Sequence, residues 1–182
     1  MTVSPASRRQ IDRLLAAASR LATGVFFRRL KVVSTGRIPG TGPLIVVANH
    51  VNGLVDPVLL LAAVPRPLRF LAKSTLWEVA LLRPLLALAA VIPVYCWQDA
   101  AGDLAKNEES FARCHKVLAA SSAIALFPER TSHNEPALQP LRTGAARIVL
   151  GAEAAFGPLG VTVVPVGLTF TRRQRFRSWA LV

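Results

Sequence analysis

The sequence predicts an α/β fold: a single layered domain with a largely parallel central sheet, flanked by helices and preceded by an amphipathic helix. Three observations lead to this fold class. Short β-branched runs alternate with longer segments that carry apolar residues at helical spacing, an order typical of parallel sheets. The 182 residues are enough for one domain with a sizeable core. No internal repeat or low-complexity linker divides the chain.

The amino-terminal segment is apolar at helical spacing and allows two interpretations. Its apolar positions are Ile11, Leu14, Leu15, Ala18, Leu21, Ala22 and Val25. Arg13 and Arg20 lie on another face. The first interpretation is a helix that packs on the core of the domain. The second is an interfacial helix in the lipid headgroup layer, with Phe26 and Phe27 as apolar anchors and arginines on phosphates. The sequence leaves both open.

The rest of the chain follows the alternating pattern. A loop rich in glycine and proline comes first, at residues 36–43. Strands are predicted at residues 44–48, 68–72, 91–95, 123–127 and 161–170. Helices are predicted at residues 57–64, 76–89, 103–120 and 143–156. In such sheets, ligands usually bind at the carboxyl ends of the strands.

Composition indicates a fold that docks on a membrane surface. Hydrophobic residues make up 52% of the chain and the mean hydropathy is +0.42, which is high for a protein that lives wholly in solution. No window reaches the roughly 18 consecutive apolar residues that a spanning helix needs. Residues 76–95 come nearest, but they contain Glu78, Arg83 and two prolines. We expect peripheral or monotopic association at the cytoplasmic face, and no cleavable signal peptide.

The charge of the chain suits an anionic partner. The formal net charge is +12, from 22 basic and 10 acidic residues. Eight basic residues lie at residues 8–37, where Asp12 is the only acid, and four arginines lie at residues 172–177. Anionic lipid and nucleic acid both fit this charge. The chain has neither a zinc-ligand pattern nor the aromatic–basic signature of an RNA-binding sheet, so we predict an anionic membrane surface and no nucleic acid. Cys96 and Cys114 form no metal or redox motif, and no metal site is predicted.

The first candidate site is the segment V-V-A-N-H-V-N-G-L-V-D-P, residues 46–57. Asn49 and His50 follow a predicted strand, at its carboxyl end. Asp56 is predicted to cap the next helix, with Pro57 at the first helical position. Capping explains the aspartate but not the histidine. A histidine one short loop from a carboxylate makes a general-base dyad, in which the carboxylate fixes the tautomer and the second ring nitrogen takes a proton.

The second candidate site follows another predicted strand. The segment A-L-F-P-E-R-T-S-H-N-E-P, residues 125–136, presents Glu129 and Arg130 directly after a proline. Downstream, Q-P-L-R-T-G-A-A-R places Arg142 in front of a helix whose backbone amides can face an anion. A surface arginine is usually only solvated, so Arg142 is a candidate because of this place and not because of its charge alone.

Five motifs, in order, make the chain similar to a known family. They are N-H-V-N-G-L-V-D-P, F-L-A-K-S-T-L, V-I-P-V-Y, F-P-E with L-Q-P-L-R-T-G-A-A-R, and V-V-P-V-G-L-T-F. Their order and spacing resemble the glycerophospholipid acyltransferase family from about residue 20 to the last residue. Most members place four residues between the histidine and the aspartate, whereas this chain has five, Val51 to Val55. It therefore looks like the wider-spaced subgroup, which includes glycerol-3-phosphate acyltransferases and bacterial relatives that acylate lysophosphatidate.

The resemblance implies transfer of a fatty acyl group from acyl-CoA, or from an acyl carrier protein, to a hydroxyl of glycerol 3-phosphate or lysophosphatidate in phospholipid biosynthesis. His50 would deprotonate that hydroxyl, and Asp56 would orient and charge-stabilise His50. No cofactor beyond the acyl donor is then needed. The substrate-binding candidates are Asn52, Lys73, Glu129, Arg130, Arg142 and Pro165. Lys73 and Arg142 are the candidates for the acceptor phosphate. Residues 1–30 would form a membrane-associating helix and residues 31–182 the acyltransferase domain.

Three departures from the family pattern motivate an alternative. Cys96 stands where the family often has arginine, and Arg130 stands where it usually has glycine. The chain also stops at Val182, where many relatives continue. One hypothesis is that Arg130 partly replaces the charge lost at position 96, because its forked cation can grip phosphate. The alternative function is a catalytically impaired family member that binds acyl-CoA or anionic lipid without turnover.

Overall fold

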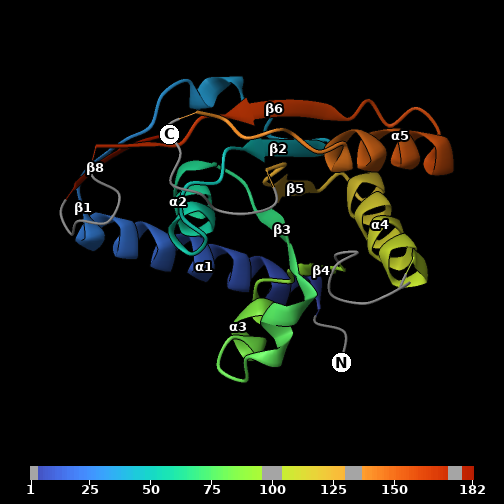
Figure 1. Ribbon diagram of the computed structural model, residues 1–182, viewed down its shortest axis with the longest axis horizontal. Coiled ribbons are helices and arrows are strands. Elements are labelled where there is room, and N and C mark those ends of the chain that lie inside the picture. The colour runs from blue at the N-terminus through green and yellow to red at the C-terminus, as the bar shows by residue number, and fades with distance from the viewer. Residues whose placement is uncertain (1–3, 96–103, 130–136, 172–177) are drawn as a thin grey trace.

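The computed structural model places a five-stranded, all-parallel sheet at the centre of the protein (Figure 1). Its strands lie in the order β4 (Ile92–Val94), β3 (Leu68–Lys73), β5 (Ala123–Leu126), β2 (Leu44–Ala48) and β6 (Thr162–Val166). A short 3₁₀ turn, η1 (Thr35–Arg37), lies in the loop before β2. The structure describes residues 4–95, 104–129, 137–171 and 178–182. The sheet confirms the predicted α/β class.

Helices cover both faces of the central sheet, so successive residues of its strands enter opposite cores. Val46 of β2 belongs to the core on the side of α2 (Val55–Ala63). Ile45, its neighbour in the chain, belongs to the core under α4 (Leu104–Ala119) and α5 (Gly144–Phe156). Both side chains are completely buried. The middle strands therefore consist of continuous apolar runs, as the sequence showed.

The first helix, α1 (Pro5–Phe26), lies against α2 through small polar side chains (Figure 1). Ser19 and Thr23 are its buried residues. Five of the seven residues of the apolar stripe are exposed instead, with 69% exposure at Leu14, 70% at Leu21 and 60% at Val25, while Ile11 and Leu15 are half-buried. The helix does pack on the domain, as the first interpretation expected, but through the face of Ser19 and Thr23 and not through most of the stripe. Among the described helices, none is long and apolar enough to cross a bilayer.

An ion pair fastens α1 to the central sheet. Asp12 accepts hydrogen bonds from two nitrogens of Arg69 on β3, at 2.8 and 2.7 Å, and from Arg8 one turn earlier in α1. Burial on its own raises the pKa of Asp12, but the hydrogen bonds and charges of Arg69 and Arg8 outweigh it and hold the pKa below the usual 3.8. The stability that this pair contributes is present above that value and is lost as the pH falls through the lowered pKa.

A second sheet of three strands follows no pattern that the sequence analysis recognised. β1 (Phe27–Lys31) pairs in parallel with β8 (Ser178–Leu181), which pairs antiparallel with β7 (Thr169–Phe170). β1 reads F-R-R-L-K, with too many charges for a typical strand. Phe27 is 3% exposed and packs with Leu59, so the expectation that it anchors in a membrane is wrong. The expected end of the helix at residue 30 falls inside β1.

Two predicted elements are broken in the structure. The helix predicted at residues 76–89 is a 3₁₀ turn, η2 (Ser74–Glu78), followed by the short α3 (Arg83–Leu88). Pro84 lies in the first turn of α3, where its missing N–H is harmless. A helix continuing through this position would lose a hydrogen bond and meet a clash with the proline ring. The strand predicted at residues 161–170 is divided between β6 and β7.

Helices α4 and α5 approach each other closely at Gly151. His115 of α4 lies over this glycine, and a Cβ added there would be 2.5 Å from His115 Nε2 and 2.6 Å from its Cε1. These separations are far below van der Waals contact, so a side chain at position 151 would force the His115 ring to move. Burial lowers the pKa of His115. Its Nε2 is buried and has no hydrogen-bond partner among the residues that the structure describes.

Gly151→Ala should lower the free energy of unfolding by about 1–3 kcal/mol, because the new methyl group must displace the His115 ring. Urea unfolding measures the change. Gly24→Ala is the matched control: Gly24 is also helical, but an added Cβ meets nothing within 4 Å. This control should be neutral or stabilising by about 0.5–1 kcal/mol. Adding His115→Ala to Gly151→Ala should recover part of the loss. Equal stability of Gly151→Ala and the wild type would contradict the close approach.

Candidate active site

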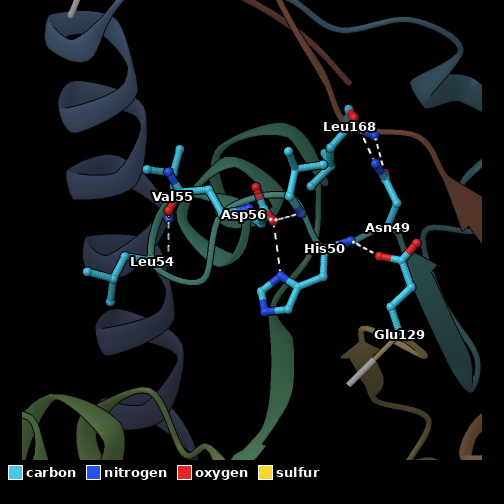
Figure 2. Close-up of polar contacts among 9 residues, drawn as sticks. Asn49, His50, Leu54, Val55, Asp56, Glu129 and Leu168 are labelled. Carbon is cyan, nitrogen blue, oxygen red and sulfur yellow. Dashed lines mark hydrogen bonds and ion pairs between the residues drawn. The ribbon is translucent and has the colours of Figure 1, made fainter. Parts of the chain in front are cut away.

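The two candidate segments meet at the carboxyl edge of the central sheet. β2 and β5 are parallel neighbours, with Val47 beside Leu126. Residues that follow these two strands therefore lie at the same level. Figure 2 shows His50, which follows β2, with its ring bonded to Asp56 and its backbone bonded to Glu129. The parallel register thus brings together residues from both segments.

Asp56 holds the loop between β2 and α2 through a single carboxylate oxygen. Its Oδ2 accepts hydrogen bonds from Nδ1 of His50 at 3.0 Å and from the backbone N–H groups of Val51 and Asn52 at 2.7 Å each. The aspartate side chain is completely buried, whereas that of His50 is 14% exposed. The charge therefore depends on these donors in place of water.

The predicted capping role of Asp56 is wrong. α2 begins at Val55, and the N-cap position is occupied by Leu54, whose side chain cannot accept a hydrogen bond. The Oδ1 atom of Asn52 accepts from the backbone N–H groups of Leu54 and Val55, at 3.3 and 3.4 Å. Asp56 lies in the first helical turn, where its charge faces the positive end of the helix dipole. Asn52, a predicted substrate-binding residue, turns its side-chain oxygen toward the start of the helix.

The bond to Asp56 determines the tautomer of His50. A carboxylate only accepts hydrogen bonds, so Nδ1 carries the proton and Nε2 is the unprotonated nitrogen of the neutral ring. Phe127, the residue after β5, stacks on the imidazole with ring centroids 4.1 Å apart and planes 15° apart. In Figure 2 the second ring nitrogen points away from Asp56. The ring is thus oriented by a charge at one edge and by an aromatic face, with Nε2 left as a base.

Glu129 bonds to the backbone of His50. Its Oε2 accepts from the His50 N–H at 2.7 Å, and its Oε1 accepts from the N–H of Gln139 at 3.2 Å. The residue is 6% exposed. Nearby, the backbone N–H of Arg142 donates to the carbonyl oxygen of Pro128 at 3.0 Å. Glu129, predicted to bind substrate, thus connects the end of β5, the segment before α5 and the His50 loop.

Asn49 joins the site to the turn after β6. Its Nδ2 donates to the carbonyl oxygen of Leu168 at 2.9 Å, and its Oδ1 accepts from the Leu168 N–H at 2.6 Å (Figure 2). Leu168 lies between β6 and β7, where the strand predicted at residues 161–170 divides, and among the described residues its backbone bonds to Asn49 and not to a neighbouring strand. Sequence reasoning missed the roles of Asn49 and Phe127. Their positions directly beside His50 and at the end of a neighbouring strand were the available signals.

The other predicted substrate-binding residues have different places. Lys73 ends β3 at the carboxyl edge that holds the site, and Arg142 precedes α5 with an exposed side chain. Pro165 is exposed on β6, an edge strand, which tolerates proline because one side of its ladder is unpaired. Arg130 and Cys96 lie outside the described residues.

A buried carboxylate that orients a histidine with one unprotonated nitrogen is the arrangement of a general-base catalyst. Its place at the carboxyl ends of parallel strands is where α/β sheets bind ligands. Residues 29–169 match the family model described as Acyltransferase. The chain therefore belongs to the acyltransferase family, as the order of the motifs predicted.

Two curated relatives and one solved structure are similar to the chain. Glycerol-3-phosphate O-acyltransferase 2 of Saccharomyces cerevisiae is 40% identical over 76 residues, which cover 42% of this chain and 10% of that protein. Glycerol-3-phosphate O-acyltransferase 1 of the same yeast is 35% identical over 80 residues, 43% of this chain and 10% of that protein. The matches thus span about a tenth of the length of these relatives.

The crystal structure of the 1-acyl-sn-glycerophosphate acyltransferase PlsC from Thermotoga maritima shares the fold of this chain. The TM-score is 0.69 and the sequence identity is 19%, and the alignment covers 100% of this chain and 70% of that one.

Glu129→Ala should lower kcat by up to about 100-fold with little change in KM, because a loosened His50 backbone misplaces the base. Glu129→Gln keeps one acceptor oxygen and should lie between the wild type and the alanine variant. Steady-state acyl transfer measures both parameters, and circular dichroism checks the fold. A rise in the acceptor KM at constant kcat would contradict the backbone role and favour direct substrate binding.

Proposed function

We propose that this chain transfers a fatty acyl group from an acyl thioester, acyl-CoA or acyl carrier protein, to a hydroxyl of glycerol 3-phosphate or lysophosphatidate. One observation carries the proposal: His50 Nδ1 bonds to the buried Asp56, which leaves Nε2 as a base at the carboxyl edge of the sheet. The names of the yeast relatives and of the Thermotoga maritima protein support the choice of a glycerol phosphate acceptor.

The proposed reaction needs one base and no enzyme nucleophile. Nε2 of His50 takes the proton of the acceptor hydroxyl as its oxygen attacks the thioester carbonyl carbon. The new C–O ester bond forms and the C–S bond breaks, so the thiolate leaves. The imidazolium then returns its proton to the thiolate. Asp56 stabilises the imidazolium between these two transfers, since its charge lies beside Nδ1.

Lys73 and Arg142 are proposed to hold the phosphate of the acceptor. Both belong to the carboxyl edge of the sheet, on either side of β5 in sequence, and charge-assisted hydrogen bonds suit a phosphate. The Arg142 side chain is exposed and makes no ion pair among the described residues. The hypothesis that Arg130 compensates for Cys96 remains a prediction, because both lie outside the described residues.

His50→Ala should reduce acyl transfer by about 10²–10⁴-fold, the usual effect of losing a positioned general base. Asp56→Asn should also be severely impaired, because it removes the charge that faces the imidazolium. His115→Ala, the loss of a histidine remote from this site, is the matched control and should retain its rate. Purified variants are assayed with labelled acyl-CoA. His50→Ala at more than about half the wild-type rate would exclude this mechanism.

A panel of glycerol 3-phosphate, lysophosphatidate and other lysophospholipids, each with labelled acyl-CoA, should reveal one preferred acceptor. The wild type should turn over many times per chain with that acceptor. Saturable binding of acyl-CoA with no turnover on any acceptor would support the catalytically impaired alternative instead.

We also propose that the chain works on a membrane surface, at the cytoplasmic face, through the exposed stripe of α1. Leu14, Leu21 and Val25 repeat at helical spacing on a helix whose opposite face is held by the domain. An apolar stripe flanked by arginines is typical of a helix in the headgroup layer. Leu54, in the loop that carries His50, is 75% exposed and supplies a further apolar contact beside the site.

Leu21→Gln should reduce partitioning onto liposomes, because a helix in the headgroup layer loses buried apolar area. Leu150→Gln is the matched control, since Leu150 is exposed to a similar degree, 69%, but lies on α5. Liposome sedimentation should also show preference for anionic over neutral lipid, weakened by salt. Point variants suit this test better than removal of residues 1–30, which would take most of β1 away. Equal partitioning of both variants would argue against α1 as the contact.

A further inference from the structure

A cavity of about 390 Å³ lies between α1 and the turn that joins α2 to β3. Its volume falls in the range of roughly 300–1,000 Å³ that small-molecule sites have. The floor is apolar and includes Leu61, Val64, Leu68 and Phe70. One wall is the flank of α1, from Arg9 to Arg20. We call it the α1 cavity.

The α1 cavity carries positive charge that the described chain does not neutralise. Its lining includes Arg9, Arg13, Arg20, Arg66 and Arg69, with Asp12 as the one acid among the lining residues. Two of these arginines have structural tasks. Arg69 is paired with Asp12, and Arg66 donates to backbone carbonyl oxygens on the loop before β2 and at the turn before β5. Among the residues that the structure describes, no carboxylate pairs with the other three guanidinium groups.

These three arginines lie on one flank of α1. Arg9, Arg13 and Arg20 are spaced by four and seven residues, which places them on the same side of a helix. Arg20 donates one bond, from Nε to the carbonyl oxygen of Ala62 at 3.4 Å, which directs it toward the end of α2. The side chains of Arg9 and Arg13 make no hydrogen bond or ion pair within the described residues. Like charges held side by side favour an anion between them.

The charged flank lies about 100° around the helix from the exposed stripe. Arg13 and Arg20 each precede a leucine of that stripe, Leu14 and Leu21. A helix with those leucines in the headgroup layer holds the neighbouring guanidinium groups at the level of lipid phosphates. Guanidinium groups bind phosphate oxygens through two parallel hydrogen bonds. The apolar floor suits the first methylene groups of the acyl chains.

We infer that the α1 cavity binds the phosphate-bearing headgroup of an anionic phospholipid, held by Arg9, Arg13 and Arg20. This site is separate from His50. α2 starts beside the His50 loop and ends beside the cavity, and its nine residues span about 13 Å. The inference rests on the membrane association proposed above, but not on acyl transfer.

The test is calorimetric titration of the full chain with dihexanoyl phosphatidylglycerol below its micelle concentration. This phosphodiester is neither a substrate nor a product of the proposed reaction, and variants of the cavity lining decide whether it binds in the α1 cavity. The wild type should bind it saturably. Arg13→Gln should weaken binding by about 10- to 100-fold, the effect of losing a charge-assisted pair. Arg37→Gln removes the same charge from an exposed residue of η1 that does not line the cavity, and should change binding by about twofold or less.

Ala16→Leu distinguishes binding in the cavity from non-specific attraction of the lipid to positive charge. Ala16 lines the cavity, and leucine keeps the helix propensity and the net charge while filling the space. It should weaken binding about as much as Arg13→Gln, with thermal unfolding as the check on the fold. Wild-type binding by both Ala16→Leu and Arg13→Gln would overturn the inference. If inorganic phosphate bound as tightly as the short-chain lipid, the ligand of the cavity would be a soluble anion. The assignment to a lipid headgroup would then be wrong.

Two further variants test lipid binding in the cavity independently of acyl transfer and of membrane association. His50→Ala should bind the short-chain lipid like the wild type, whatever its activity. Leu21→Gln should lose liposome partitioning yet keep cavity binding in solution. Cavity binding in a wild type that does not partition onto liposomes would refute the proposed location and support the cavity.

Discussion

The geometry of the candidate active site depends on one oxygen atom, Oδ2 of Asp56. Three N–H groups converge on it, two from the backbone and one from the ring of His50. A carboxylate removed from water is tolerated in a protein only when donors replace its lost hydration. The loop after β2 has to wrap around that oxygen to supply them, and the wrapping carries the histidine to the carboxylate. The orientation of the base is therefore a consequence of satisfying a buried charge.

The other contacts of the site act mainly on the backbone. Glu129 and Asn49 each use a side chain with two polar atoms to bridge segments that are distant in sequence. Together they fix the ends of β2 and β5 and the turn after β6 around His50. The backbone around His50 is therefore held in place before any substrate binds. Phe127 stacks on one face of the imidazole, so the ring has little room to rotate. Its Nε2 atom points away from Asp56 (Figure 2).

Local patterns in the sequence predicted the central sheet and the meeting of His50 with Asp56. The sheet is buried on both faces, so its strands are apolar runs, and the two residues share one short loop whose spacing decides whether they touch. Contacts between distant segments could not be predicted in the same way. Neither β1 nor β8 has a strand pattern of its own, and nothing near Asn49 in sequence indicates Leu168. The helical period of α1 identified an apolar side, but it could not show that Ser19 and Thr23 would form the packed side instead.

The pairing of β1 with β8 joins the first described strand to the last, and this has a consequence for the order in which the protein folds during synthesis. During synthesis, α1 and β1 leave the ribosome long before β8 exists. Phe27 lacks its partner strand throughout that time, and the cluster it forms with Leu59 and Ala180 cannot close. Closing so long a loop costs entropy before its contacts compensate, so the small sheet should form after the more local β–α–β units of the central sheet. Before the small sheet forms, α1 can already pack against α2 and pair with Arg69 of β3, so the helix docks on the domain in two separate stages.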